Sequence, residues 1–380
     1  MRFNRDLNFL WAIFLSAFFA GPNGRIHAQA PVLVTTNTTI RVMASNLSSG
    51  NNQRYESPGL NILKGLKPDV VAMQEFNYSS TNGNGVNTSA AFREMVDNTF
   101  GTNFVYFRES SATETYTIPN GIISRYPILA SGSWDDTLIP DRGFAWAQID
   151  LPGSNDLYVV SIHLKASSGS SATRASEATN LKALIQAKFT NNAFLIVAGD
   201  CNTYSSGEAC LATFRTFLND SPAPADNLGG TNTNAGRSER YDYVFPSFSL
   251  NSNRVATVIS SGTFANGLVF DSRVYTPLDE VAPVVSTDSG ATGMQHMGVV
   301  KDFRIPYTVT NFVTVPPPIL VFNSANVILW QGLSNVTYSV QASTNLPNFS
   351  TIGTASSTTE ILSFTNQNSG EQRFFRVVYP

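Results

Sequence analysis

Apolar runs alternate with polar segments along most of the chain, and they predict the elements of the fold. Short, almost continuous apolar runs predict buried strands, and apolar positions at helical spacing predict amphipathic helices. The predicted strands cover 39–46, 70–76, 104–107, 121–128, 144–151, 157–163, 194–200, 240–245 and 298–305. The predicted helices cover 51–66, 90–100, 172–189 and 209–218. Strands outnumber helices, and the helices fall between strand pairs, so we expect a layered α/β (α+β) fold. The expected arrangement is a four-layer sandwich of two packed β-sheets with helices outside.

The pattern changes after a proline-rich linker at 311–318, which contains Pro316, Pro317 and Pro318. Residues 319–380 show short alternating runs separated by turn-rich gaps, which is typical of a small β-sandwich. This segment has no histidine or cysteine. We expect it to be an adhesive, spacer or sorting module that binds a cell surface or a polymer, and 31–310 to be the catalytic domain.

Residues 1–30 have the pattern of a secretory signal peptide. Arg2 and Arg5 precede an apolar run over 9–20, and 28–30 has the small-x-small form of a cleavage site. The run is too short to span a membrane as a helix, and we expect no transmembrane segment in the mature chain. Pro31 is unusual directly after a cleavage site, so the position of cleavage is left open. We expect the protein to be secreted.

Charged residues are scarce, at 13% of the chain against about a quarter in average proteins. The formal charge is −3, and loss of residues 1–30 would remove three arginines and one aspartate and change it to −5. An acidic chain lacks the many Lys and Arg contacts on which tight non-specific binding to nucleic acid depends. The net charge of the whole chain does not exclude a local basic groove.

The chain has two cysteines, Cys201 and Cys210. In an exported protein they can close a loop of about ten residues through a disulfide. We expect this bond, with a buried free thiol at Cys201 as the alternative.

Candidate chemistry gathers where predicted strands end. Asp200 and Asn202 follow the apolar run at 194–197 and point the same way in an extended chain, although such residues are also typical of an ordinary turn. Without residues 1–30 the chain keeps two histidines, His163 and His296, and both lie at predicted strand ends. Two acidic residues also lie at or near strand ends: Glu75 and Asp242.

These residues belong to segments that resemble the motifs of the endonuclease/exonuclease/phosphatase superfamily, in the order of that family. The segments are Asn46, 67–75 (KPDVVAMQE), 120–128 (NGIISRYPI), 161–164 (SIHL), 199–202 (GDCN) and 240–243 (RYDY). Each is weak singly, and six in order across 40–305 form a strong signal. The resemblance does not extend to 1–30 or 311–380.

The resemblance implies a divalent metal, Mg²⁺ or Mn²⁺, held by the hard oxygen ligands of Asn46 and Glu75. The family usually has an Asp before its last histidine, whereas this chain has Gln295 before His296. That difference leaves the number of metals open. Asp288 is close to Gln295 in the sequence, but the sequence does not place it in space.

The resemblance also implies the catalytic roles. His296, oriented by Asp242, would take a proton from the attacking water. His163 and Asn202 would donate hydrogen bonds to phosphoryl oxygens, and Asp200 would orient the nucleophile or assist the leaving oxygen. Tyr106 and Arg125 are candidate phosphate contacts, but ordinary packing and surface exposure explain them better.

We therefore expect a secreted, metal-dependent phosphodiesterase that hydrolyses phosphate esters with an activated water. Its substrate is a nucleic acid, a phospholipid or a small phosphate ester, with an endonuclease-like activity favoured over a sphingomyelinase or a small-ester phosphatase. The apolar stretch at 264–270 is the segment to inspect for membrane entry. A non-catalytic binding or adhesion protein that retains the fold is the alternative. The oligomeric state is left open, with a monomer expected.

Overall fold

The computed structural model describes residues 19–20, 26–50, 53–78, 88–110, 116–315, 319–324, 326–346, 348–367 and 373–378. The chain divides into two compact units, Thr36–Tyr307 and a second unit made of Met1–Thr35 with Thr308–Pro380. Most of the predicted signal peptide and the three prolines of the predicted linker lie outside the described residues. The predicted domain limits stay predictions.

The first sheet has the strand order β11-β15-β2-β3-β5-β4, with β14 also paired to β15 and β1 to β2. β2 and β3 are parallel, with Ser45 opposite Met73. Every residue of β3 is buried, which explains its continuous apolar sequence. The strands are β1 (Phe19–Ala20), β2 (Ile26–Ser45), β3 (Val70–Met73), β4 (Val105–Arg108), β5 (Gly121–Ser124), β11 (Arg254–Val255), β14 (Leu268–Phe270) and β15 (Gly298–Val315).

The second sheet has the order β10-β9-β8-β7-β6. β8 and β9 are parallel, and the other neighbours are antiparallel. The α3 helix (Ser171–Lys188) connects the parallel pair, as a parallel connection requires. The strands are β6 (Ile128–Asp135), β7 (Gly143–Ile149), β8 (Leu157–His163), β9 (Phe194–Asp200) and β10 (Asp242–Pro246).

The two sheets pack face to face through one shared hydrophobic cluster. Val42 and Val70 of the first sheet and Val159 and Ile196 of the second belong to it, and all four are fully buried. Side chains alternate between the two faces of a strand. The next residues along these strands therefore face outward into two further clusters.

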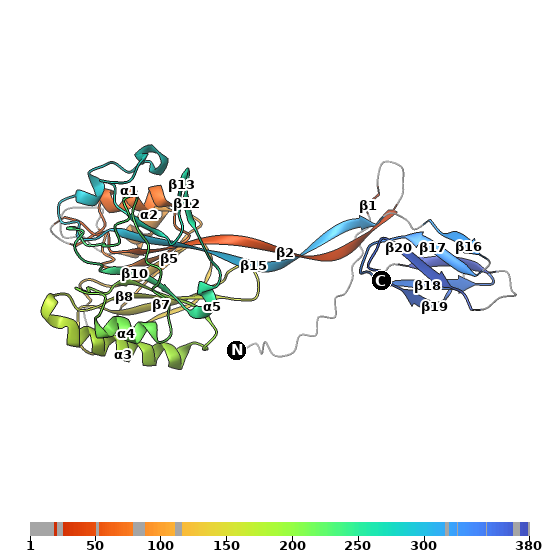
Figure 1. The fold of residues 1–380 in the computed structure, drawn as a ribbon, viewed down its shortest axis with the longest axis horizontal. Helices are drawn as coiled ribbons and strands as arrows, with labels where there is room; N and C mark the ends of the chain where they lie inside the picture. The colour runs from red at the N-terminus through yellow and green to blue at the C-terminus, as the bar shows by residue number, and fades with distance from the viewer. Residues whose placement is uncertain are drawn as a thin grey trace. The chain divides into compact units, whose positions relative to one another are not determined.

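Helices cover both outer faces (Figure 1). α1 (Ser57–Leu66) and α2 (Ser89–Thr99) pack on the first sheet, and α3 and α4 (Ala209–Arg215) pack on the second. The predicted four-layer sandwich of two sheets flanked by helices is confirmed.

Several element limits differ from the sequence prediction. The first helix begins at Ser57 rather than at 51, next to Pro58, whose fixed φ suits the first turn. β15 runs to Val315 rather than ending at 305, and so includes the first five residues of the predicted linker segment. The strands β6, β11 and β14 were not predicted, and neither were several short elements: α5 (Phe248–Asn251), the β12 (Thr257–Ile259) and β13 (Gly262–Phe264) hairpin, and the 3₁₀ turns Ser168–Ser170, Leu278–Val281 and Asp288–Gly290.

The C-terminal segment forms two three-stranded antiparallel sheets, as the sequence predicts. Their orders are β16-β17-β20 and β19-β18-β21. Ile328 and Trp330 of one sheet and Tyr338 and Val340 of the other share a small buried cluster. The strands are β16 (Val321–Ser324), β17 (Val327–Gln331), β18 (Tyr338–Ser343), β19 (Ser350–Ala355), β20 (Ile361–Thr365) and β21 (Phe374–Val378).

The expected disulfide is wrong. Cys201 and Cys210 are free thiols, and both are buried. They belong to the cluster between the second sheet and its helices, where small apolar side chains fill space. In the described part of the chain, none of the helices is both long and apolar enough to cross a membrane.

Candidate active site

Three neighbouring strands of the second sheet each bring one polar residue to the same place. His163 is the last residue of β8 and pairs with Asp200, the last residue of β9. Asp200 also pairs with Asp242, the first residue of the antiparallel β10. All three residues are almost completely buried. Strand pairing alone therefore places two carboxylates and an imidazole side by side.

The first sheet brings its own polar residues to this edge. Asn46 directly follows β2, and Glu75 lies two residues beyond the parallel strand β3. His296 lies two residues before β15, the other neighbour of β2. The Asn46 amide donates to Asp200 Oδ2 at 3.1 Å and so joins the two sheets across the sandwich.

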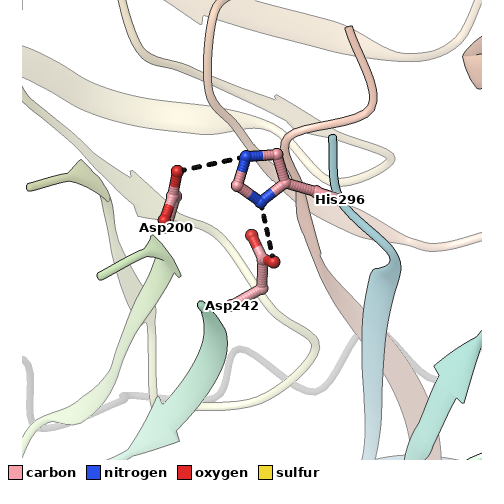
Figure 2. Close-up of side chains that lie close together, drawn as sticks. All are labelled: Asp200, Asp242 and His296. Atoms are coloured by element: carbon pink, nitrogen blue, oxygen red, sulfur yellow. Dashed lines mark hydrogen bonds and ion pairs between the residues drawn. The ribbon is translucent and has the colours of Figure 1, made fainter. Parts of the chain in front are cut away.

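One carboxylate oxygen, Asp200 Oδ2, is the centre of the cluster. Besides Asn46, the amide of Asn202 donates to it at 3.0 Å. The Nε2 atoms of His163 and His296 lie 3.3 Å and 3.4 Å from it. Figure 2 shows the His296 ring between the two acids, with its Nδ1 3.0 Å from Asp242 Oδ2. Six of the sequence-predicted residues are thus brought together, namely Asn46, His163, Asp200, Asn202, Asp242 and His296, and Glu75 follows β3 at the same edge of the first sheet.

The Asp200–Asn202 segment is both a turn and part of the site. The Asn202 N–H donates to Asp200 Oδ1 at 2.7 Å, which is an Asx-type turn. Asn202 has φ 49°, and so has Glu75, a conformation that is uncommon outside glycine and often found at functional sites. Gly199, which precedes Asp200, allows β9 to lie close to β8, because a Cβ there would meet the Ile162 carbonyl oxygen at 2.1 Å.

Thr233 is a site residue that the sequence did not reveal. Its buried hydroxyl donates to Asp242 Oδ2 at 2.8 Å, the same oxygen that faces His296. The hydroxyl also accepts from the backbone N–H groups of Tyr241 and Asp242. Thr233 therefore fixes the direction of the Asp242 carboxylate. It lies in a loop rich in Asn, Thr and Gly, which carries no periodic signal.

The two histidines have opposite electrostatic environments. Burial alone would lower the pKa of His296, but the carboxylates of Asp242 and Asp200 outweigh it and raise that pKa well above its ordinary value. Burial, with the positive charges of Arg142 and His296, holds the pKa of His163 well below 6.5. Burial and the Asp242 charge raise the pKa of Asp200. His163 is therefore neutral, whereas His296 binds a proton strongly.

Residues 59–270 match the sequence model of the endonuclease/exonuclease/phosphatase family. The chain belongs to this family. The match contains Glu75, His163, Asp200 and Asp242, and His296 lies after it and contacts Asp242. The protein is therefore a metal-dependent phosphoesterase with a buried Asp/His cluster.

Solved structures similar to this family member cover most of its length. An endonuclease/exonuclease/phosphatase from Beutenbergia cavernae has a TM-score of 0.47 and 13% identity, and the match covers 90% of this chain and 100% of that one. The human Nocturnin catalytic domain has a TM-score of 0.46 and 15% identity, with 74% and 98% covered. Staphylococcus aureus beta toxin has a TM-score of 0.42 and 12% identity, and the match covers 69% of this chain and 99% of that one. No curated protein sequence matches the chain.

The donor atoms of this phosphoesterase fit a divalent metal. The Asn46 amide nitrogen is directed at Asp200 and His296. Its Oδ1 is buried and has no hydrogen-bond partner among the described residues. Glu75 is oriented by the Ser48 hydroxyl and by the Gln53 amide at 3.3 Å. Amide and carboxylate oxygens are ligands that hard cations prefer.

A second group of donors lies in the same place. Asp200, Asp242 and His296 each offer a ligand atom within 4.8 Å of the others. Asp242 Oδ1 has no partner among the described residues. The family's use of a divalent metal is therefore compatible with this chain.

Neither Gln295 nor Asp288 supplies the missing family carboxylate. Gln295 is exposed, and its backbone carbonyl accepts from Ala235 at 2.7 Å. Asp288 accepts from the backbone N–H of Val285 at 2.9 Å and from the amide of Asn61 at 3.3 Å. Its carboxylate stabilises its own loop.

The two candidate phosphate contacts, Tyr106 and Arg125, are not part of the cluster. The Tyr106 hydroxyl donates to the Ser89 carbonyl at 3.1 Å, and its ring packs on the first hydrophobic cluster. Arg125 is half exposed and pairs with Asp69 at 3.0 Å. Both have the packing and surface roles that the sequence favoured.

Proposed function

We propose that the protein is a secreted, Mg²⁺- or Mn²⁺-dependent phosphodiesterase with endonuclease-like activity. The observation that carries the proposal is the convergence of His163 and His296 on one carboxylate oxygen of Asp200. A phosphodiester needs a proton acceptor for water and donors for the phosphoryl oxygens where charge develops. The cluster offers both kinds of group within one buried edge.

His296 has the geometry of a general base. Asp242 faces its Nδ1 at 3.0 Å and stabilises the charged imidazolium, so that a proton is accepted at Nε2. When bound, a divalent cation would neutralise phosphate charge and, by repulsion, favour the unprotonated form of His296. Thr233 and Asp242 keep the ring oriented throughout.

His163 is the better placed of the two expected hydrogen-bond donors. It is buried and neutral, so its ring carries one N–H, at Nε2, which lies 3.3 Å from Asp200 Oδ2, or at Nδ1, which has no partner among the described residues. Both N–H groups of the Asn202 amide already donate, to Asp200 Oδ2 and to the Leu164 carbonyl at 3.0 Å each, so a phosphoryl oxygen has to displace one of them. His163 is positioned before substrate arrives, which is what stabilisation of a transition-state charge requires. Asp200 orients the nucleophile or assists the leaving oxygen.

A nucleic-acid substrate is favoured over a membrane lipid. Within the apolar stretch 264–270, Leu268–Phe270 forms β14, which is buried and paired with β15. Phe264 packs against the first hydrophobic cluster. This stretch is occupied by the fold, so it does not offer a segment for entering a bilayer.

A single assay tests the activity. The purified protein is given plasmid DNA, a chromogenic phosphodiester and sphingomyelin, with Mg²⁺, Mn²⁺ or a chelator. We expect metal-dependent cleavage of DNA, and a rate about 10²–10⁴-fold lower for His296→Ala. Fastest turnover of sphingomyelin or of a small ester would overturn the substrate assignment. Absence of metal-dependent turnover on every substrate would refute the proposal and favour a binding protein.

Secretion and the role of the C-terminal module are also proposals. The charged start, apolar run and small-x-small site of residues 1–30 support export. The module's own buried cluster supports an independent unit that binds a cell surface or a polymer. Fractionation of producing cells tests export, and pull-down of residues 319–380 on cell-wall material tests attachment.

A further inference from the structure

Two tyrosines flank the proposed base and have no part in the reaction described above. Tyr204 follows Asn202 by two residues, and Tyr241 directly precedes Asp242. Their ring centroids are 5.4 Å apart, and the Tyr241 ring lies 5.8 Å from the His296 ring. Both are partly exposed. One partly exposed aromatic ring, that of Tyr241, therefore lies beside the residue that would activate water, and the Tyr204 ring lies next to it.

These rings are not part of the hydrophobic core. Among the described residues, neither tyrosine belongs to one of the buried clusters or to the side chains packed against them. By contrast, Tyr243 on the same strand as Asp242 is buried and stacks on Phe245 with centroids 4.7 Å apart. Core packing accounts for Tyr243 but not for Tyr204 and Tyr241.

A buried ion pair holds Tyr204 rigidly. Arg174 and Glu208 form two hydrogen bonds, at 2.7 Å and 2.8 Å. Glu208 also accepts from the Tyr204 backbone N–H at 2.7 Å, and the Arg174 guanidinium lies 5.6 Å from the Tyr204 ring centroid. The ring is thus fixed through its backbone and against a cation.

Arg174 also joins two loops of the site. Its Nη1 donates to the carbonyls of Lys165 and Ser167 at 2.9 Å and 2.8 Å, in the loop that follows His163. Arg174 is fully buried, and taking an ion pair out of water is unfavourable unless its hydrogen bonds are satisfied. Here they are satisfied, and the result is a preorganised surface next to the cluster.

Tyr241 is fixed from the other side. Its backbone N–H donates to Thr233 at 2.9 Å, so the hydroxyl that orients Asp242 also orients this residue. The Tyr241 ring is also held by its neighbours, with ring centroids 5.4 Å from Tyr204 and 5.8 Å from His296.

We propose that Tyr204 and Tyr241 form a stacking subsite for a base of single-stranded nucleic acid, next to the phosphodiester that is cleaved. This inference rests on the proposed function. Aromatic side chains stack on every base because each base has a π-face, and this stacking does not depend on charge. It therefore suits a chain with only 13% charged residues and a net charge of −3.

The structure favours a base over the other ligands that aromatic rings bind. The Arg174 guanidinium already lies over the Tyr204 ring, 5.6 Å from its centroid, in a position that a quaternary ammonium such as a choline headgroup would take. In a duplex, both faces of each base are already stacked on neighbouring bases. A flexible single strand can present the face of a base to the tyrosines.

The test compares two single-stranded oligonucleotides of equal length, one with bases and one with abasic residues, in the presence of Mg²⁺. Stacking on an aromatic side chain corresponds to roughly 5- to 150-fold per base. We expect the full-length protein to prefer the base-containing strand in kcat/KM by a factor in this range. Tyr204→Leu and Tyr241→Leu should reduce the preference towards one without slowing cleavage of the abasic strand.

Tyr126→Leu is the matched control. Tyr126 is also a partly exposed tyrosine with an arginine near its ring, Arg125 at 5.0 Å. Tyr126 follows Ser124, which pairs with Val70, the first residue of β3. Glu75 follows Met73, the last residue of β3, so Tyr126 lies towards the opposite end of this strand from the site. The control should keep the full preference. Tyr204→Phe and Tyr241→Phe should keep it too, and thermal melts show whether each leucine variant is folded.

The outcomes separate the two proposals. Equal kcat/KM on both strands, or an unchanged preference in both folded leucine variants, overturns the stacking subsite and leaves the phosphodiesterase intact. Faster turnover of sphingomyelin micelles, lost in the same variants, overturns the assignment to a base in favour of a lipid headgroup. Failure to cleave any phosphodiester overturns the proposed function itself.

Discussion

Thr233 offers the most direct test of how the His296–Asp242 pair is held. Its hydroxyl donates to Asp242 Oδ2 at 2.8 Å and accepts from the backbone N–H groups of Tyr241 and Asp242 at 2.9 Å and 2.8 Å. Thr233→Val keeps the shape of the side chain and removes all three hydrogen bonds. The Asp242 carboxylate then loses the partner that fixes its direction towards His296.

The structure sets the expected magnitude. A hydrogen bond to a charged group contributes roughly 1.5–3 kcal/mol, and buried N–H groups left without a partner add to the loss. We expect the free energy of unfolding to fall by about 2–4 kcal/mol. For a unit of this size, that lowers the melting temperature by roughly 5–15 °C. If the lost hydrogen bond is expressed in the transition state, kcat falls by roughly 10- to 150-fold.

The assay combines thermal melts with steady-state hydrolysis of a phosphodiester in Mg²⁺. Thr233→Ser keeps the hydroxyl and is the matched control, expected close to the unmodified protein in kcat. The reasoning fails if Thr233→Val hydrolyses at the unmodified rate. It also fails if the serine variant loses as much as the valine variant, because the effect then comes from the lost methyl group.

Three further substitutions test buried or metal-binding groups. Burial raises the pKa of Glu109 to about 7, so the folded state binds its proton more tightly, and stability should fall as the pH rises from about 4.5 to about 7. Glu109→Gln should flatten this part of a pH series of urea melts. Burial lowers the pKa of Lys301 to about 7, and its Nζ has no partner among the described residues. Because the folded state binds this proton less tightly, stability should rise between about pH 7 and 10.5, and Lys301→Met should be stabilising, most strongly below pH 7. Glu75→Gln should weaken Mg²⁺ binding in calorimetry while the melting temperature without metal changes little, since it removes a charged oxygen ligand.

Each of these predictions has a result that contradicts it. For Glu109 it is an unchanged pH slope in the glutamine variant, and for Lys301 a methionine variant that is less stable than the unmodified protein at pH 6. For Glu75 it is unaltered Mg²⁺ affinity, which would place the metal on other ligands.

Local sequence predicted much of the fold because the strands are short and buried on both faces. Val70–Met73 reads as a continuous apolar run since alternate residues fill two different clusters. The polar residues directly after such runs, Asn46 and Asp200, were found for the same reason. The strand β15 was predicted too short because Pro316, Pro317 and Pro318 led to a linker assignment from 311 on, although 307–315 alternates Val, Thr, Tyr and Phe as a strand does.

The parts that were missed depend on contacts between distant segments. Thr233 orients Asp242 from a loop without periodicity, and Tyr204 and Tyr241 gain meaning only from their distance to His296. The expected disulfide failed because spacing permits a bond but does not require it. Cys201 and Cys210 instead fill a hydrophobic cluster as free thiols.

The cluster spans two sheets, so its geometry depends on how the sheets are joined, and Ser161 tests this. The Ser161 hydroxyl, on β8, donates to the Met73 carbonyl and accepts from the Gln74 amide, both at 2.8 Å, just before the site residues of each sheet. Ser161→Ala removes both hydrogen bonds and leaves the Met73 carbonyl and the Gln74 amide without this partner. We expect the free energy of unfolding to fall by about 1–3 kcal/mol. We expect kcat to fall as well, because Asn46 and Asp200 meet across the same junction.

Ser247→Ala provides the comparison for Ser161. Its hydroxyl donates to the Ala193 carbonyl at 2.9 Å and accepts from the Leu195 N–H at 3.2 Å, at the start of β9, whereas Asp200 is at its end. This variant should lose similar stability in urea melts but keep its kcat. Equal kcat in the two variants would mean that the junction between the sheets does not control the site. A lower kcat for Ser161→Ala alone would show that packing of the two sheets positions Asn46 against Asp200.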